Sequence, residues 1–398
     1  MSKKVSIIGQ GYVGLPLAMN LAKVGFNVFG VDSSKQKVEL LNSGISGVED
    51  VSNLEISEVI STGFYEATVD FRKVGESDVV IICVPTPLGK NSKPDLSYLK
   101  SALIDISAHI KKGTLIILES TVSPGTTRGL VVESIEKNSN LPISDFFLVF
   151  SPERIDPRNL QWNIKNTPKL VAGLTSECLD LGFHFYSSFI DDVIKCESLE
   201  VAETAKLLEN SFRLVNISFI NELSFFCEKI GIDINDVVKA AATKPYGYMP
   251  FYPSIGVGGH CIPVDPVYLA TTAKEVDVQT KFLDLAIQIN SEIPSHYVIK
   301  AKNKLGSLKN KKIIVVGVAY KPNISDVRET PVASLIDGLR DAGAEVYWHD
   351  SLVKEWNGQT SVDLSSDYDL AIIATRHNNV NLKLLKDVPL IMAGGKYK

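Results

Sequence analysis

The amino-acid sequence predicts an α/β protein in which two doubly wound domains are joined by a central helical domain with a long connecting helix. Three observations carry this prediction. Short apolar runs alternate with amphipathic stretches over the N-terminal half, an apolar period of three or four residues persists across residues 199–230, and a second set of short apolar runs begins at Lys311. Alternating strands and helices are typical of a parallel sheet.

The first domain is predicted from five short apolar runs with helical patterns between them. Such βαβ units build a Rossmann-like sheet. The expected strands are Val5–Ile8, Val28–Val31, Val79–Cys83, Leu115–Leu118 and Phe147–Phe150.

The connecting helix is expected from Leu199 to Ile230, where apolar residues recur at helical spacing. This length exceeds that of an ordinary globular helix. The helix therefore connects domains, and its many apolar positions predict a homodimer built on this region. The positions are Val201, Ala205, Leu208, Phe212, Val215, Phe219 and Leu223.

A second Rossmann-like unit is expected at the C-terminal end of the chain. KKIIVVGVAY reads as a strand, TPVASLIDGLRDAG as a helix, and AEVYWHD and DLAIIAT as two further strands. The expected division is 1–198 for a dinucleotide-binding domain, 199–300 for the helical domain and 301–398 for the second Rossmann-like domain.

Composition excludes several classes of function. The 398 residues carry a net charge of −5 and no run of Lys or Arg, which argues against nucleic acid as a partner. The sequence contains no apolar stretch of about 20 residues, so no membrane span is expected. The five scattered cysteines fit a reducing, cytoplasmic location, and without a C-x-x-C pair or a His/Cys cluster no metal site is expected.

A glycine-rich turn after the first expected strand predicts a dinucleotide site. GQGYVG places Gly9, Gly11 and Gly14 in the G-x-G-x-x-G pattern, in which the second glycine admits a pyrophosphate to a helix N-terminus. Asp32 ends the next strand and accepts hydrogen bonds from a ribose, which favours NAD over NADP. The alternatives are FAD and a turn without ligand. The predicted cofactor-binding residues here are Gly9, Gly11, Tyr12, Val13, Gly14 and Asp32.

The segment GVGGHCIPVDP, residues 256–266, places Cys261 on a constrained loop. Gly258 and Gly259 leave room for a ligand, and a thiol in such a place is a candidate nucleophile or an unreactive side chain. Asp265 has a structural alternative as an N-cap before Pro266.

Lys206 and Asn210 are four positions apart and share one face of the long helix. The spacing of this pair is explained equally well by a solvent-exposed helix face and by a functional site.

Together these segments resemble the UDP-glucose/GDP-mannose dehydrogenase family over nearly the whole chain. The resemblance implies an N-terminal NAD domain, a central domain with the dimer interface, and a C-terminal UDP-binding domain. The matching motifs are GQGYVG with Val31–Asp32, VPTPL at 84–88, ESTVSPGTT at 119–127, SPER at 151–154, AETAKLLEN at 202–210, GVGGHCIPVDP at 256–266 and GVAYKPNISDVRETP at 317–331.

The resemblance implies that one active site oxidises a sugar C6 alcohol to an acid in two hydride transfers, with two NAD⁺. Cys261 would form a thiohemiacetal with the aldehyde and then a thioester, which water hydrolyses. Lys206 and Asn210 would stabilise the oxyanions at C6. Asp265 and Thr121 would orient the water, with Glu153 as a candidate base.

The remaining implied residues bind cofactor and substrate. Thr86 and Thr121 would line the nicotinamide side, and Arg328 would contact the cofactor or the sugar nucleotide. The residues expected to bind the UDP-sugar are Glu153, Arg154, Lys206, Asn210, Tyr252, Gly258 and Lys321.

Branch-specific residues favour a UDP-N-acetylhexosamine, UDP-GlcNAc or UDP-ManNAc, over UDP-glucose. The UDP-glucose branch has lysine where Val264 stands and a second glutamate where Pro157 stands. Arg158 and Ser254–Ile255 depart from the N-acetylhexosamine pattern, and Arg158 is a candidate donor to the acetyl carbonyl or a phosphate. The alternatives are a UDP-glucose dehydrogenase, a dehydrogenase that stops after one hydride, and a non-catalytic NAD sensor.

Overall fold

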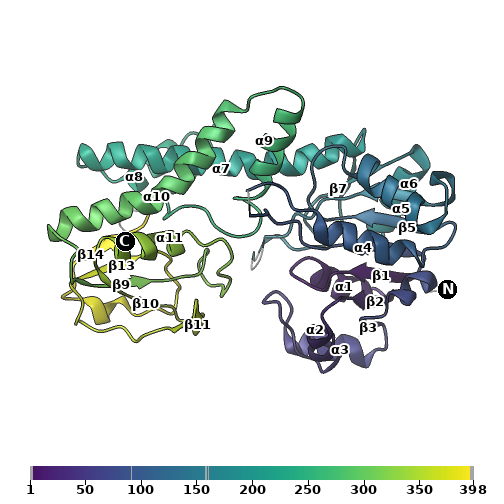
Figure 1. The fold of residues 1–398 in the computed structure, drawn as a ribbon, viewed down its shortest axis with the longest axis horizontal. Helices are drawn as coiled ribbons and strands as arrows, with labels where there is room; N and C mark the ends of the chain where they lie inside the picture. Colours follow the sequence, from purple (N-terminus) through teal and green to yellow (C-terminus); the bar gives the residue numbers. More distant parts are fainter. Residues whose placement is uncertain (1–2, 91, 157–158, 160, 395–398) are drawn as a thin grey trace. The chain divides into compact units, whose positions relative to one another are not determined.

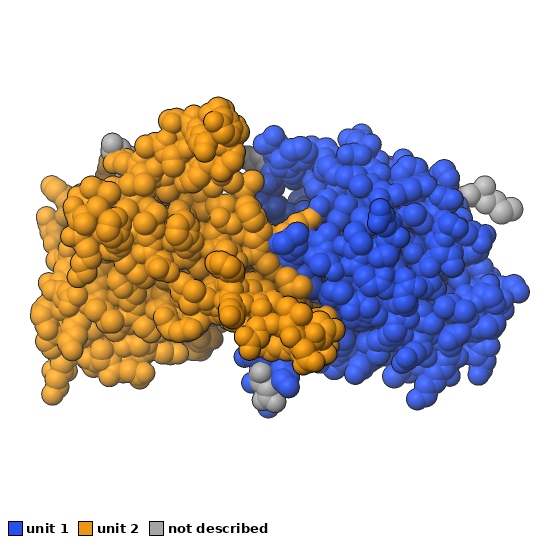
Figure 2. All heavy atoms as spheres, turned by 90° about the horizontal axis from the view of Figure 1, so that it is seen from above, with its two compact units in different colours: residues 1–208 blue, residues 209–398 orange. Residues whose placement is uncertain are grey.

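The computed structural model describes residues 3–90, 92–156, 159 and 161–394. The chain forms two compact units, residues 1–208 and 209–398 (Figure 2). The boundary falls inside the long helix α7 (Leu199–Lys229), which confirms the predicted connecting helix to within one residue at its end. The finer division at residues 198 and 300 stays a prediction.

The first unit contains an eight-stranded sheet within the described residues, in the order β3-β2-β1-β4-β5-β6-β7-β8. The five predicted strands are confirmed as β1, β2, β4, β5 and β6. All neighbouring strands run parallel except β6 and β7, which are antiparallel. The strands are β1 (Lys4–Ile8), β2 (Asn27–Val31), β3 (Tyr65–Thr68), β4 (Val79–Ile82), β5 (Leu115–Leu118), β6 (Phe147–Phe150), β7 (Lys169–Gly173) and β8 (Val193–Lys195).

Two apolar clusters pack on this sheet, because successive strand residues point to opposite faces. Ile7 and Ile81 belong to one cluster, and Ile8 and Ile82 belong to the other. The helices that contribute to the clusters are visible in Figure 1. The helices of this unit are α1 (Gly14–Lys23), α2 (Lys35–Asn42), α3 (Asn53–Ser61), α4 (Ser97–Ser107), α5 (Val132–Ser139) and α6 (Ser176–Ser187).

The second unit contains a parallel sheet in the order β10-β9-β13-β14 and confirms the second Rossmann-like prediction. Its strands are β9 (Lys312–Val316), β10 (Glu345–His349), β13 (Leu370–Ile373) and β14 (Leu390–Met392), with a short hairpin of β11 (Glu355–Trp356) and β12 (Gln359–Thr360). Its further helices are α8 (Ile234–Ala241), α9 (Asp265–Glu275), α10 (Lys281–Leu305) and α11 (Val332–Asp341).

Helix α10 packs along α11, and Tyr297 and Ala301 of α10 join the same apolar cluster as Leu335 and Ile336 of α11. The central helices and the second sheet therefore form one compact unit. Within the described part of the chain, no helix has the length and apolar character needed to cross a membrane.

Candidate active site

The glycine-rich turn follows β1 and leads into α1, as predicted. Gly9 has φ of +96°, and a Cβ there would lie 2.7 Å from the Cys83 carbonyl oxygen. A Cβ on Gly14 would lie 1.9 Å from the Gly9 oxygen. A Cβ on Gly11 would have no described neighbour within 4 Å. Gly9 and Gly14 are thus required by packing, whereas Gly11 leaves open space for a pyrophosphate.

Asp32 follows β2 beside this turn. Its carboxylate accepts hydrogen bonds from the Gln10 amide at 2.9 Å and the Ser34 amide at 3.0 Å. It also pairs with the Lys37 ammonium at 2.7 Å. The turn and the acid together fit the pyrophosphate and the ribose of NAD. Sequence reasoning missed Lys37, because no pattern links a lysine of α2 to the acid.

We expect Gly11→Ala to raise the KM for NAD about tenfold or more, because the added methyl occupies the space into which the pyrophosphate would fit. The melting temperature should stay unchanged, since the Cβ meets no described atom within 4 Å. Gly47→Ala, at another glycine with no described neighbour within 4 Å, is the matched control. A wild-type KM in the Gly11 variant would contradict the placement of the pyrophosphate.

Thr86 and Thr121 follow β4 and β5, which are neighbours in the sheet. Their strands end at the same edge as β1, where the glycine turn begins. Ser120 donates from its hydroxyl to the Val84 carbonyl at 2.7 Å and so ties the two loops together. Both threonines therefore lie at the carboxyl edge of the sheet, where parallel α/β proteins bind ligands.

Lys206 and Glu153 are buried side by side. The Lys206 ammonium donates to the Glu153 carbonyl at 2.7 Å and lies 3.8 Å from the Glu153 carboxylate. Only 5% of Lys206 and 8% of Glu153 is exposed. A solvated helix face is therefore the wrong interpretation of Lys206, because a buried ammonium needs such partners.

Two further side chains, those of Glu203 and Arg154, hold the loops around this pair. The Glu203 carboxylate of α7 accepts from the Gly125 amide at 2.6 Å and the Thr127 amide at 2.9 Å. The Arg154 guanidinium donates to the Pro168 carbonyl at 2.9 Å. Glu203 was not predicted, although it belongs to the AETAKLLEN motif. Pro157 and Arg158 lie outside the described residues.

In the second unit, Asn210, Asp265 and Cys261 form a second group. The Asn210 side-chain amide donates to the Asp265 carboxylate at 2.6 Å, and both residues are buried. The Asp265 amide donates to the Cys261 carbonyl at 2.9 Å, which closes a turn that leaves Cys261 exposed. Asp265 is the first residue of α9 and Val264 is its N-cap, so the N-cap interpretation of Asp265 is wrong.

His260, which precedes Cys261 in the chain, and two of the other cysteines lie in environments that differ in charge and burial. Burial lowers the pKa of His260, and the charge of Arg328 lowers it further, because both disfavour the charged imidazolium. Burial, and then the charge of Glu119, raises the pKa of Cys83 well above its ordinary value. Cys227 is buried in an apolar cluster. Among the cysteines that the structure describes, Cys83 and Cys196 are partly exposed and Cys261 is exposed.

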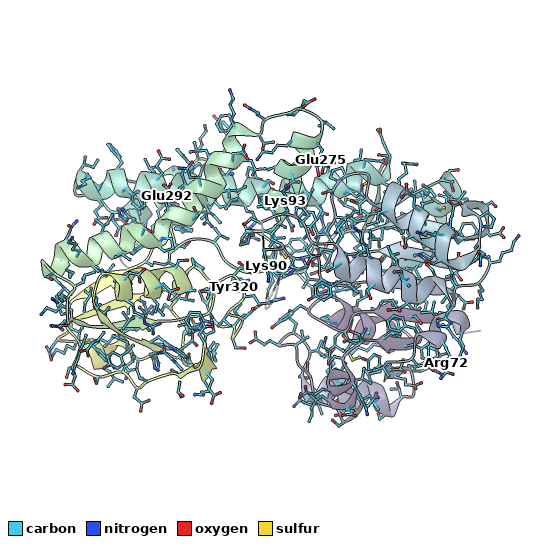
Figure 3. All side chains as sticks on the ribbon, in the orientation of Figure 1. Arg72, Lys90, Lys93, Glu275, Glu292 and Tyr320 are labelled. Atoms are coloured by element: carbon cyan, nitrogen blue, oxygen red, sulfur yellow. The ribbon has the colours of Figure 1, made fainter. Side chains whose placement is uncertain are left out.

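Gly258 and Gly259 pack against residues 317–330, which we call the β9 loop. A Cβ on Gly258 would lie 2.7 Å from the Glu329 oxygen, and one on Gly259 would lie 2.8 Å from the Tyr320 ring. The Gly259 amide donates to the Arg328 carbonyl at 3.0 Å. The room that the two glycines leave is thus taken by the β9 loop. Tyr320, labelled in Figure 3, was not predicted.

The predicted residues Lys321 and Arg328 both lie on the β9 loop. The Arg328 guanidinium donates to the buried Asp326 carboxylate from its Nε at 3.0 Å and from its Nη2 at 2.6 Å. Lys321 is partly exposed, and Tyr252, upstream of the Cys261 turn, is 49% exposed. Ile255 is buried in the apolar core of the unit.

The structure therefore brings the predicted residues together in two groups. Lys206 and Glu153 are in contact in the first unit, beside the loops that carry Thr86 and Thr121. Asn210, Asp265 and Cys261 are linked in the second unit, where the β9 loop packs on the turn before Cys261. Helix α7 contributes Lys206 to one group and Asn210, one helical turn later, to the other. Among the described residues, no group of His, Cys, Asp and Glu side chains could hold a metal ion.

Three family models match the chain in sequence order. Residues 3–190 match the NAD binding domain of the UDP-glucose/GDP-mannose dehydrogenase family, residues 200–292 match its central domain, and residues 314–393 match its UDP binding domain.

Individual relatives agree with the models. A UDP-N-acetyl-D-mannosamine dehydrogenase of Campylobacter jejuni is 34% identical over 86% of this chain and 84% of its own length. A UDP-N-acetyl-D-glucosamine 6-dehydrogenase of Pseudomonas aeruginosa is 34% identical over 94% of this chain and 90% of its own. The solved structure of a UDP-D-ManNAc dehydrogenase from Pyrococcus horikoshii has a TM-score of 0.91 at 30% identity, covering 99% of this chain and 96% of that one.

Proposed function

Because the chain belongs to the UDP-glucose/GDP-mannose dehydrogenase family and is an NAD-dependent oxidoreductase, we propose that it oxidises C6 of a UDP-N-acetylhexosamine to the acid. The observation that carries the proposed reaction is the exposed thiol of Cys261, on a turn that the Asn210–Asp265 pair anchors. A covalent oxidation needs a reachable nucleophile on a rigid support.

The first unit supplies the cofactor site. NAD⁺, when bound, accepts a hydride at its nicotinamide ring. The open face at Gly11 and the N-terminus of α1 hold its pyrophosphate, and Asp32 holds its ribose. Thr86 and Thr121, which follow β4 and β5, would line the nicotinamide side.

The second unit supplies the nucleotide end of the substrate. Residues 314–393 match a UDP binding domain, and the β9 loop lies at the carboxyl end of its first strand. Lys321 and Arg328 of this loop bring positive charge to a diphosphate. Because the Asp326 carboxylate holds Arg328 from one side, the guanidinium is presented in a fixed orientation.

The first oxidation removes a hydride from C6 and a proton from its hydroxyl to leave an aldehyde. The Cys261 sulfur then adds to the aldehyde carbon, and the oxygen takes up the thiol proton, which gives a thiohemiacetal. Loss of a second hydride and a proton gives a thioester. Water cleaves the C–S bond, so that the acid leaves and Cys261 is regenerated as a thiol.

Lys206 and Asn210 stabilise the negative charge that develops on the C6 oxygen in these steps. The buried ammonium and the buried amide are already oriented by Glu153 and Asp265, so they need little reorganisation. For hydrolysis, Asp265 and Thr121 orient the water, and Glu153 is the candidate base.

The N-acetyl substrate is supported by the names of the two relatives above and by Val264 in place of a lysine. We expect UDP-GlcNAc or UDP-ManNAc to give a kcat/KM at least about tenfold above that of UDP-glucose, which corresponds to about 1.4 kcal/mol. The measurement is NADH release with the two N-acetyl sugars, UDP-GalNAc and UDP-glucose side by side. Two NADH per sugar are expected. A preference for UDP-glucose would contradict the substrate, and one NADH per sugar would contradict the reaction.

A homodimer built on α7 is part of the proposal. Phe212, Phe219 and Phe226 are seven residues apart and are 46%, 60% and 57% exposed, so one face of the helix carries an uncovered aromatic stripe. An adjoining face, about 100° around the helix, packs on α10, where Ser218 donates to the Ala286 carbonyl and Phe225 stacks on His296. Apolar stripes of this kind mark interfaces.

Light scattering is expected to give the mass of a dimer, with a total interface of roughly 2,000 Å² or more. Phe219→Asp should dissociate it, because a carboxylate would be desolvated in an apolar contact. Leu54→Asp, which changes another exposed apolar residue, is the control and should leave the mass unchanged. An active, monodisperse monomer in the wild-type chain would contradict the proposal.

We also place the protein in a reducing, cytoplasmic compartment. None of the five cysteines, all of which lie in the described part of the chain, forms a disulfide, and the proposed chemistry requires Cys261 to stay a thiol.

A further inference from the structure

The second Rossmann-like unit repeats the backbone turn of the first one. Gly9 and Gly317 follow β1 and β9 with φ of +96° and +85°. Their amides donate to Val31 and His349 carbonyls at 2.7 and 2.8 Å. A Cβ on Gly317 would lie 1.8 Å from the Thr375 oxygen, which shows how closely β9 and β13 approach there.

In each turn, the amide after the glycine also donates to an aspartate that follows the second strand of its unit. The Val318 amide donates to Asp350 at 2.8 Å, as the Gln10 amide does to Asp32 at 2.9 Å. The second oxygen of Asp350 accepts from the Leu352 amide at 2.9 Å, which matches the Ser34 contact of Asp32. Asp350 therefore stands where a dinucleotide domain places its ribose-binding acid.

The two acids differ in what else surrounds them. The partner of Asp32 is the half-exposed Lys37, whereas Asp350 is 1% exposed and its carboxylate accepts from the buried His377 ring at 3.0 Å. Burial by itself raises the pKa of Asp350, but hydrogen bonds from His377, Leu352 and Val318 outweigh it and lower the pKa to about 2. Asp350 is thus an ionised structural group without access to a nucleotide.

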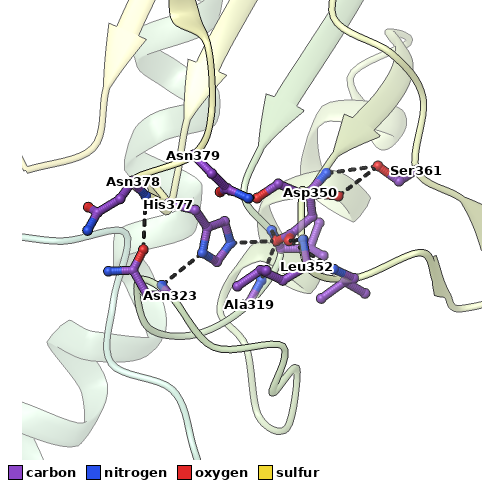
Figure 4. Close-up of polar contacts among 11 residues, drawn as sticks. Ala319, Asn323, Asp350, Leu352, Ser361, His377, Asn378 and Asn379 are labelled. Atoms are coloured by element: carbon purple, nitrogen blue, oxygen red, sulfur yellow. Dashed lines mark hydrogen bonds and ion pairs between the residues drawn. The ribbon is translucent and has the colours of Figure 1, made fainter. Parts of the chain in front are cut away.

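His377 also contacts the β9 loop directly, as Figure 4 shows. The Asn323 backbone amide donates to His377 Nδ1 at 2.8 Å. Because a backbone N–H can only donate, Nδ1 carries no proton, and Nε2–H is the donor to Asp350. Asn323 has φ of +64°, and its side-chain oxygen accepts from the Asn378 amide at 2.9 Å. The ring therefore joins the loop to the ends of β10 and β13.

We propose that His377 is a positioning residue for nucleotide binding, which holds the β9 loop through Asn323 so that Lys321 and Arg328 present their charges to the UDP diphosphate. This inference rests on the proposed function of the UDP-binding unit. The same loop packs on Gly258 and Gly259, and the Arg328 backbone carbonyl accepts a hydrogen bond from the Gly259 amide at 3.0 Å. His377 thus also supports the turn that carries Cys261, without touching substrate.

Two variants of His377 separate positioning from stability, because each retains one of its hydrogen bonds. Asn places an oxygen at the Nδ1 position and can still accept from Asn323, but it loses the donor to Asp350. Gln places a donor at the Nε2 position and can still bind Asp350, but it loses the acceptor for Asn323. Removing a donor from a buried carboxylate costs more stability than removing a neutral bond.

The experiment measures UDP binding to the intact chain by calorimetry, together with the melting temperature of each variant. We expect His377→Gln to weaken UDP binding about fivefold, which matches the loss of one hydrogen bond, and His377→Asn to weaken it by less than about twofold. The melting temperatures should fall in the opposite order, with Asn below Gln. NAD affinity should not change in either variant.

Ser361→Ala is the matched control, because its hydroxyl contacts the backbone of Asp350 at 2.9 Å and not the β9 loop. It should lower the melting temperature and leave UDP binding intact. If UDP affinity falls in the same order as the melting temperature across the three variants, the loss of binding reflects stability only. That result would overturn the inference and leave the proposed function in place. A wild-type chain that binds no UDP would overturn both.

A spectroscopic measurement checks the contact itself in the unaltered protein. The ¹⁵N shifts of the His377 ring should show a proton on Nε2 and none on Nδ1. A ring protonated on Nδ1 would exclude the hydrogen bond from Asn323 and overturn the inference.

Discussion

Cys261→Ser is expected to lower the rate of acid formation at least about a thousandfold while NAD and UDP affinities stay within twofold of wild type. Serine is a far weaker nucleophile than a thiolate near neutral pH, and the ester that it would form hydrolyses slowly. Because Cys261 is exposed, the loss of its sulfur should not change stability. The measurements are NADH formation in a single turnover and cofactor binding by fluorescence.

A second cysteine provides the control for this substitution. Cys196 is partly exposed and lies outside both groups of site residues, so Cys196→Ser should keep full activity. One NADH per enzyme followed by release of aldehyde from the Cys261 variant would support the covalent step. Wild-type turnover in that variant would exclude it.

Lys206→Met is expected to lower kcat by about 100- to 1,000-fold, because a buried ammonium that stabilises an oxyanion is replaced by a neutral side chain of similar length. It should also lower the free energy of unfolding by about 3 kcal/mol, since the buried Glu153 carboxylate loses its neighbouring ammonium. KM for the sugar nucleotide should change much less than kcat. Steady-state kinetics and urea unfolding give the two quantities.

The control removes an ion-paired lysine at the surface. Lys195 pairs with Asp180 in solvent, so Lys195→Met should change neither kcat nor stability measurably. If Lys206→Met loses stability but keeps its kcat, Lys206 is a structural group only, and the oxyanion role belongs elsewhere.

The predicted strands could be found because strands of a parallel sheet are buried on both faces and form continuous apolar runs. Val79–Ile82 and Leu115–Leu118 are examples, with all four residues of each buried. The strand β8 was missed because its residues are mostly exposed, and β7 was missed because it contains a lysine. Lys169 is tolerated there since Glu119, from the neighbouring loop, pairs with it at 2.9 Å.

The residues of the candidate site also divide into those that the sequence predicts and those that it does not. The glycine turn and Asp32 could be predicted because each depends on local spacing, a tight turn and a strand end. For Cys261, the spacing left a nucleophile and an unreactive side chain as alternatives, and the family resemblance favoured the nucleophile. Lys206 could not be separated from a solvated lysine by spacing, because its burial depends on Glu153, far away in the sequence.

The sequence by itself determined the two Rossmann-like units, the long helix and the dinucleotide turn, because these follow from periodicity and from the backbone freedom of particular glycines. Only the tertiary structure decided which polar side chains are buried and what they contact. The Asp32–Lys37 pair, the Asn210–Asp265 bond and the His377 link between Asp350 and Asn323 are all of this kind. A buried polar group is stable only with a partner, and that partner is supplied by whichever segment the fold brings beside it.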